Sequence, residues 1–187
     1  MEKAIYLVLF VVIIFIGYSW YSVAQYHIED DSTAIQSNLT EWSNRGSGGI
    51  NPDVIKMVQI DDTRSYIVLF ETQGSNMGYA HFIKGWNGKF KIEHSGHGTK
   101  IIGYQEIHTN KGIYGLIYGE NPDLKIDHIQ ADMYYGDFSF SSSVREDEKF
   151  VRYEKIPNDI EKPFPAELTF YDEGGFVIKR EDLKINR

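Results

Sequence analysis

The chain has no cysteine among its 187 residues. Disulfides, thiolate metal ligands and cysteine nucleophiles are therefore excluded. A domain without disulfides depends on its hydrophobic core for stability, and a chain of this length is long enough to bury one.

Positive charge is also scarce. The chain carries 19 Lys and Arg against 27 Asp and Glu, a formal net charge of −8, and the basic residues are not clustered. Nucleic-acid binding needs a basic surface that neutralises phosphates. The sequence therefore predicts no nucleic-acid partner.

Linear catalytic motifs are missing as well. There is no G-x-S-x-G elbow, P-loop or G-x-G-x-x-G segment. The carboxylates mostly flank turns and lack the spacing of a calcium loop. We expect no cofactor and no metal, and a binding, sensing or accessory role is favoured over catalysis. The alternative is an envelope hydrolase whose carboxylates or histidines converge only in the folded structure.

One long apolar run is present at the N-terminus. Residues 4–24 carry no charge, and a helix rising ~1.5 Å per residue would cover the ~30 Å hydrocarbon core of a bilayer. Tyr18, Trp20 and Tyr21 lie near its end, where aromatic rings favour the headgroup layer. Residues 1–24 are therefore predicted to form a transmembrane anchor.

The flanking charges predict an orientation. Lys3 precedes the run, and the next basic residue is Arg45. The positive-inside rule then places the N-terminus in the cytoplasm and the rest outside, as a single-pass cell-membrane protein. A cleavable signal peptide is the alternative, because Ser22 and Ala24 are small residues at the spacing of a cleavage site. Either interpretation places the following domain outside the cytoplasm.

Residues 25–50 are predicted to form one short helix and a flexible joint. Asp31 or Ser32 can cap the helix, and Ile35, Leu39 and Trp42 follow the spacing of one apolar stripe. The segment "RGSGG" then stops the helix.

Residues 51–187 show short apolar runs separated by turn sequences such as "DDTR", "QGSN", "WNG" and "ENPD". This pattern predicts a mainly β domain, an antiparallel β-sandwich or a barrel-like fold. The runs "SYIVLFE" and "GIYGLIYG" are apolar at both parities, as in central strands covered on both faces. Pro163 and Pro165 mark "IEKPFPAEL" as an edge strand or connector.

The stretch "KIEHSGHGTK" tests for a metal or acid/base site, since His94 and His97 form H-x-x-H. Strand alternation would place His94 on the inward face with Phe90 and Ile92, and Glu93 on the other face. His97 lies between two glycines, at what reads as the tip of a hairpin turn. No metal site is predicted here, and His97 is kept as a weak ligand-binding candidate.

Three further histidines, His81, His108 and His128, fall within predicted strands. A half-buried histidine with one hydrogen-bond partner explains each of them. Convergence of three imidazoles on one point would instead indicate a metal site.

Aromatic residues in turns supply the remaining candidates. Trp86 lies in "KGWNGK", and Tyr134 and Tyr135 lie in "MYYGDF". Exposed rings of this kind can stack on sugars or anchor a protein partner, whereas a turn tryptophan can also fold back over its own sheet. The expected partners are therefore the membrane, through the N-terminal helix, and an envelope protein or glycan.

Overall fold

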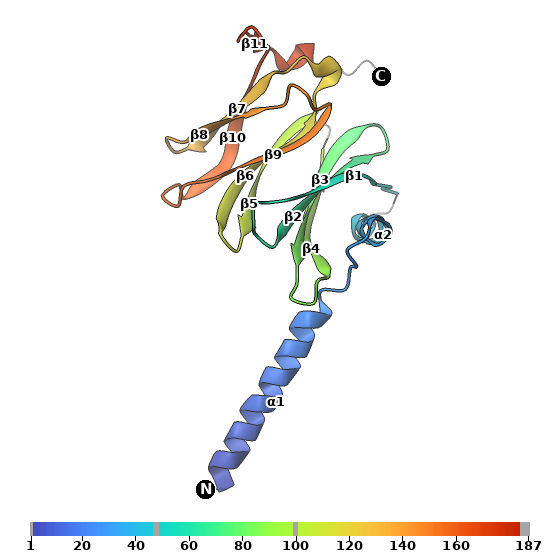
Figure 1. Ribbon diagram of the computed structural model, residues 1–187, viewed down its shortest axis with the longest axis vertical. Helices are drawn as coiled ribbons and strands as arrows, with labels where there is room; N and C mark the ends of the chain where they lie inside the picture. The colour runs from blue at the N-terminus through green and yellow to red at the C-terminus, as the bar shows by residue number, and fades with distance from the viewer. Residues whose placement is uncertain (1, 47–48, 99–100, 184–187) are drawn as a thin grey trace.

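The computed structural model describes residues 2–46, 49–98 and 101–183, except for the side chains of residues 2–5, 7, 8 and 22. The described chain is mainly β, with antiparallel sheets and two α-helices (Figure 1). The predicted fold class is confirmed at this level.

The strands of the described chain form three antiparallel sheets. The first sheet contains β1 (Asp53–Gln59), β2 (Ser65–Thr72), β3 (Asn76–Lys84) and β4 (Phe90–His97), in this spatial order. The second contains β5 (Ile102–Thr109), β6 (Gly112–Glu120) and β9 (Lys149–Lys155). The third has the order β11 (Val177–Ile178), β10 (Lys162–Tyr171), β7 (His128–Tyr135) and β8 (Ser139–Ser143). The helices are α1 (Glu2–Ala24), α2 (Ser32–Ser43) and the short 3₁₀ turns η1 (Pro122–Leu124) and η2 (Arg180–Asp182).

The second sheet lies between the other two, because β6 contributes to two separate cores. Leu116 packs with Leu69 of β2 in one core, whereas Ile117 packs with Ile129 of β7 in the other. Successive residues of a strand point to opposite faces, so a strand covered on both sides must be apolar at both parities. The prediction of two-sided burial for "GIYGLIYG" is confirmed, and β2 is buried in the same way.

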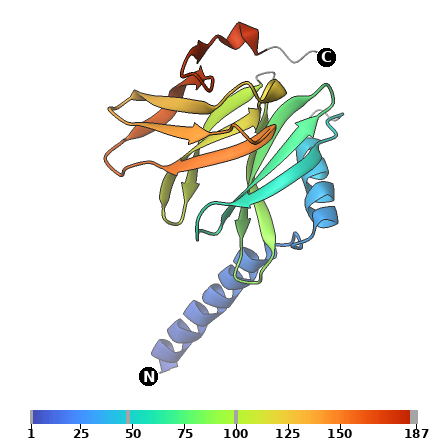
Figure 2. The ribbon, with the colours of Figure 1, turned by 45° about the horizontal axis from the view of Figure 1, so that its top comes forward.

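The helix α2 covers the outer face of the first sheet, as Figures 1 and 2 both show. Its N-cap is Asp31, whose Oδ1 accepts a hydrogen bond from the Ala34 amide at 2.9 Å. Ile35 and Leu39 are buried and pack with Phe82 of β3. The predicted helix and its apolar stripe are confirmed, and residues 47–48 of the predicted joint lie outside the described residues.

The helix α1 extends away from the β domain (Figure 1). Its described apolar side chains are exposed, including those of Phe10, Ile13 and Phe15. In the described part of the chain no helix is both long enough and apolar enough to cross a membrane. The described residues therefore do not support the transmembrane anchor predicted at residues 1–24, of which residue 1 and several side chains lie outside this description.

The proline-containing stretch forms the first part of β10. In the described chain this stretch is paired with β7 on one side and is not paired with β11 on the other, so the prediction of an edge strand is confirmed and the alternative of a connector is wrong. The register with β7 is interrupted between Lys162 and Ala166, where both prolines lie, and β11 pairs only with Phe170 and Tyr171. The prolines thus occupy the irregular part of the strand, where a missing N–H donor leaves no gap in the ladder.

Candidate functional site

A cavity of about 370 Å³ lies where the end of β4 meets β5, β6 and the first part of β10. We call it the inter-sheet pocket. Its described lining residues are His97, Gly98, Ile102, Gly103, Tyr104, Tyr118, Phe164, Pro165, Ala166, Leu168 and Arg180. The volume is typical of small-ligand sites, which are mostly apolar with a few polar groups.

Aromatic rings form two walls of the pocket. On one wall, Tyr104 stacks with Phe164 at 6.3 Å between ring centroids and 12° between ring planes. The Tyr104 hydroxyl donates a hydrogen bond to the Pro163 carbonyl at 2.9 Å, which joins β5 to β10. On the other wall, Tyr118 of β6 lies over Gly103 of β5, its direct cross-strand partner.

Glycines position these rings. A Cβ atom at Gly103 would lie 2.6 Å from the Tyr118 ring, so no other residue leaves room for it there. The same arrangement recurs in the first sheet, where Gly96 is the cross-strand partner of Tyr79 and a Cβ atom would approach its ring to 3.2 Å. An aromatic ring that covers a cross-strand glycine is a known stabilising pair in sheets.

A row of rings leads from the pocket wall into the core. Tyr118 contacts Tyr79 at 4.8 Å, Tyr79 contacts His94 at 5.5 Å, and His94 contacts His81 at 5.2 Å, each between ring centroids. His81 is 2% exposed. Its Nε2 is buried and has no hydrogen-bond partner among the described residues.

Burial disfavours the charged forms of the rings in this row and in the pocket wall. It raises the pKa of Tyr118 to about 12 and also raises the pKa of Tyr104. Burial and the neighbouring His94 lower the pKa of His81 to about 4, and burial lowers the pKa of His94. The inner side of the pocket therefore offers neutral hydroxyls and rings, whereas Arg180 supplies a cation to its lining.

The stretch "KIEHSGHGTK" folds differently from the sequence-based expectation. Residues up to His97 continue β4 and pair with β3, so the predicted turn at residues 95–98 is wrong. Gly96 explains the difference, because it lies in the strand opposite Tyr79 and leaves room for the Tyr79 ring.

A β-bulge also reverses the direction of His94. His81 pairs with His94, but the adjacent Phe82 pairs with Ile92, so Glu93 is an extra residue in β4. His94 therefore points to the opposite face from Ile92, and the expectation that both share one face is wrong. It meets His81 between the first two sheets.

The histidines lie apart from one another in the described part of the chain, except for the pair His81 and His94. Within the described ranges no group of three or more His, Asp or Glu side chains is arranged to hold a metal ion. His108 is exposed and lies 3.5 Å from Glu106, whereas His128 is paired with Asp127. His81 differs from the sequence-based expectation of a half-buried ring, because it is 2% exposed and its buried Nε2 has no hydrogen-bond partner among the described residues.

The other candidate residues lie apart from the pocket. Trp86 is 96% exposed in the β3–β4 turn and does not fold back over its sheet. This turn and His97 lie at opposite ends of the β3–β4 hairpin. Tyr134 and Tyr135 are exposed at the end of β7, in the third sheet, and contact each other edge to face at 4.9 Å. The structure therefore does not bring the four predicted residues together.

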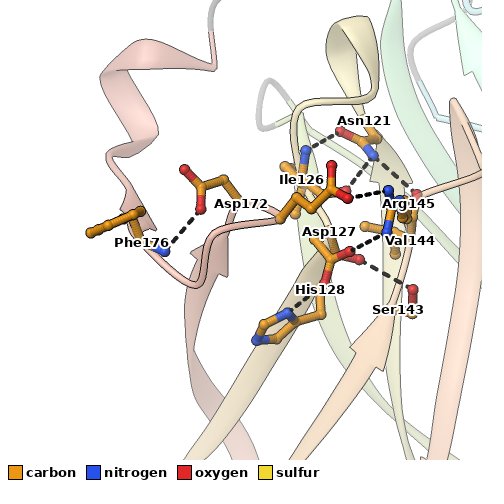
Figure 3. Close-up of polar contacts among 10 residues, drawn as sticks. Asn121, Ile126, Asp127, His128, Ser143, Val144, Arg145, Asp172 and Phe176 are labelled. Atoms are coloured by element: carbon orange, nitrogen blue, oxygen red, sulfur yellow. Dashed lines mark hydrogen bonds and ion pairs between the residues drawn. The ribbon is translucent and has the colours of Figure 1, made fainter.

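A polar network joins β7, the β8–β9 turn and the segment after β10 (Figure 3). The Asp127 carboxylate accepts a hydrogen bond from the His128 ring, with 2.9 Å between Oδ2 and Nδ1, and its Oδ1 lies 3.9 Å from the Arg145 guanidinium. Arg145 also pairs with Glu173. Next to this network, the fully buried Asn121 side chain binds the backbone of Ile126 and Val144.

Sequence reasoning missed most of the pocket residues. Tyr104 and Tyr118 lie on the consecutive strands β5 and β6, but Phe164 lies on β10, far along the chain, and only the packing of the sheets brings it to the same cavity. One local signal was available: glycines at interior strand positions often mark a close approach by another group. Gly103 fits this description.

Comparisons of the chain with protein-family models, curated proteins and solved structures give no match. The functional argument therefore rests on the geometry of this chain.

Proposed function

We propose that the protein is a membrane-anchored binding module of the cell envelope, with its β domain outside the cytoplasm. The inter-sheet pocket is its ligand site. The observation that carries this proposal is the aromatic lining, in which the Tyr104–Phe164 stack faces a cavity of about 370 Å³. Aromatic faces beside hydroxyl groups suit a ligand with a ring and several hydroxyls, such as a monosaccharide or disaccharide unit of an envelope glycan.

Binding is favoured over hydrolysis by the composition of the lining. A glycosidase needs two carboxylates across a cleft, and no carboxylate belongs to the described lining of the pocket. The neutral Tyr118 hydroxyl can donate a hydrogen bond to a sugar without activating water, whereas the Tyr104 hydroxyl already donates to the Pro163 carbonyl and can only accept.

Filling the pocket should abolish binding. A Cβ atom at Gly98 would have no heavy atom within 4 Å among the described residues, so Gly98→Trp can place a ring in the cavity with little strain. We expect affinity for a bound glycan fragment to fall at least about tenfold. Saturation-transfer NMR with a panel of envelope glycan fragments would identify the ligand, and titration would give the affinity.

Gly46→Trp is the matched control, because Gly46 has equally open surroundings but lies after α2, outside the pocket. It should bind as the unsubstituted protein does. Equal affinities for both tryptophan variants would contradict the pocket as the site, and failure of the whole panel would contradict a glycan ligand.

Membrane attachment is supported by the uncharged run at residues 4–24 and by the exposed apolar side chains of α1. Exposed apolar surface of this extent is costly in water. Lys3 before the run and the acidic segment after it support an N-terminus in the cytoplasm.

A charge in α1 should weaken this attachment. The Ile14→Lys variant places an ammonium group in the middle of the helix, at a cost of about 3 kcal/mol if that position lies at the bilayer centre. We expect it to reduce the fraction of protein that resists alkaline carbonate extraction, whereas Ile14→Leu should leave this fraction unchanged. Release of the unsubstituted protein by carbonate would contradict an embedded anchor.

An envelope hydrolase is the second candidate, favoured by the Asp127–His128 pair (Figure 3). A carboxylate can orient a histidine that acts as a general base. The His128 ring, however, stacks on Tyr171 at 4.7 Å, which covers one of its faces. Hydrolysis of an envelope glycan that is lost in Asp127→Asn would favour this candidate over binding alone.

A further inference from the structure

The β3–β4 turn holds an aromatic side chain that packs on nothing of its own sheet. Trp86 is 96% exposed, although the turn around it is well ordered by hydrogen bonds. The Gly85 amide donates to the Lys89 carbonyl at 2.8 Å, and the Gly88 amide donates to the Gly85 carbonyl at 3.1 Å. The backbone therefore presents the indole outward from a defined position.

This turn is attached to the chain that leaves α1. The Asn87 side-chain amide donates to the Tyr26 carbonyl at 2.9 Å. The Tyr26 ring lies against Gly85, where a Cβ atom would come within 2.6 Å of it. Tyr26 follows the end of α1, at Ala24, by only two positions, so the turn and the helix end are held together.

Further contacts strengthen this attachment. Ile28 and Phe90 exchange backbone hydrogen bonds of 3.0 and 2.7 Å. Lys84 pairs with Asp30 at 2.7 Å, and Lys89 pairs with Glu29 at 2.6 Å. Figures 1 and 2 accordingly show the β3–β4 turn beside the C-terminal end of α1.

The last turns of α1 carry exposed rings of the kind found at membrane interfaces, Tyr18, Trp20 and Tyr21. Trp86 lies on a turn fixed to the same end of the helix, and the Arg64 guanidinium carbon lies 6.0 Å from the centroid of its ring. An indole beside a guanidinium suits the headgroup layer, where the ring meets the acyl boundary and the cation meets phosphate.

We propose that the β3–β4 turn is a second membrane contact, in which Trp86 inserts into the phospholipid headgroup layer beside α1. This inference rests on the membrane attachment of α1 proposed above. Two contacts hold the β domain in one orientation on the bilayer, whereas a helix alone would leave it free to swing. The third sheet, with its exposed tyrosine pair, lies at the other end of the domain and stays in water (Figure 1).

Single-tryptophan variants of the full-length protein in phosphatidylcholine nanodiscs test this proposal. The chain has three tryptophans, Trp20, Trp42 and Trp86, and phenylalanine replaces two of them in each variant. Phosphatidylcholine brominated close to the headgroup quenches only indoles that touch the lipid. We expect Trp86 and Trp20 to lose fluorescence relative to unbrominated lipid, and Trp42, in α2, to keep it.

A matched control moves the indole to another exposed turn. Tyr134→Trp, with the three native tryptophans replaced, presents a ring at a position that is 70% exposed but belongs to the β7–β8 hairpin. Its fluorescence should not change with brominated lipid. Equal quenching at this position and at Trp86 would overturn the proposal.

The results distinguish the proposed membrane contact of Trp86 from the proposed membrane attachment of α1. If Trp20 is quenched and Trp86 is not, the anchor holds and the second contact is wrong, which would leave Trp86 for a protein or glycan partner. If neither is quenched, membrane attachment itself is wrong.

Discussion

The Asn121→Ala variant is expected to unfold with a free energy about 3 kcal/mol below that of the unsubstituted protein. Asn121 is fully buried. Its Nδ2 donates to the carbonyls of Ile126 and Val144 at 2.8 and 3.0 Å, and its Oδ1 accepts from the Ile126 amide at 2.9 Å. Alanine would leave the buried Ile126 amide and carbonyl without their side-chain partner, at roughly 1–3 kcal/mol for each group, whereas the Val144 carbonyl would keep its bond from the Asp147 amide.

Urea denaturation of the full-length protein in detergent would measure this effect. Asn158→Ala is the control, because Asn158 is exposed in the turn after β9 and its replacement should change stability by less than about 0.5 kcal/mol. A similar small loss for Asn121→Ala would mean that the side chain does not hold the segment before β7 against the β8–β9 turn.

Acidification should destabilise the protein through His81. Its pKa in the folded state is about 4, against an ordinary value of 6.5, chiefly because it is buried and secondly because His94 lies beside it. The unfolded chain therefore binds this proton first as the pH falls. Above pH 6.5 the ring is neutral in both states and protonation does not affect the free energy of unfolding. As the pH falls from 6.5 towards 4, this free energy decreases by on the order of 3 kcal/mol.

The His81→Leu variant should remove most of this dependence, because leucine fills a similar volume and does not titrate. The measurement is the difference in unfolding free energy between pH 6.5 and 4 for both proteins. Part of this difference should remain in the variant, since burial also lowers the pKa of His94. Identical slopes would show that His81 is not the group whose protonation opposes folding.

The elements of the fold were largely readable in the sequence. Alternation and two-sided apolar runs identify β2 and β6 as covered strands, because a residue's parity decides which face of a sheet it reaches. The cap at Asp31 and the stripe of α2 are also local, since a helix start depends on side chains three residues apart.

The errors share one physical cause. The sequence around Gly96 has the composition of a turn, yet the ring of Tyr79 across the sheet needs that glycine in a strand. A single extra residue, Glu93, reverses the face of His94. Neither a cross-strand neighbour nor a bulge can be read from a single strand, because both depend on the register of two strands.

By itself the sequence determined that disulfides and cysteine chemistry are excluded, that the domain is mainly β and that an uncharged apolar run precedes it. Only the tertiary structure decided which side chains share a site. Tyr104 and Phe164 stack because the second and third sheets pack together, and Tyr118 lines the same cavity. Trp86 lies beside α1 because Tyr26 and Asn87 connect the turn to the helix end. Both sites depend on contacts between residues far apart in the chain, whereas sequence patterns report only local geometry.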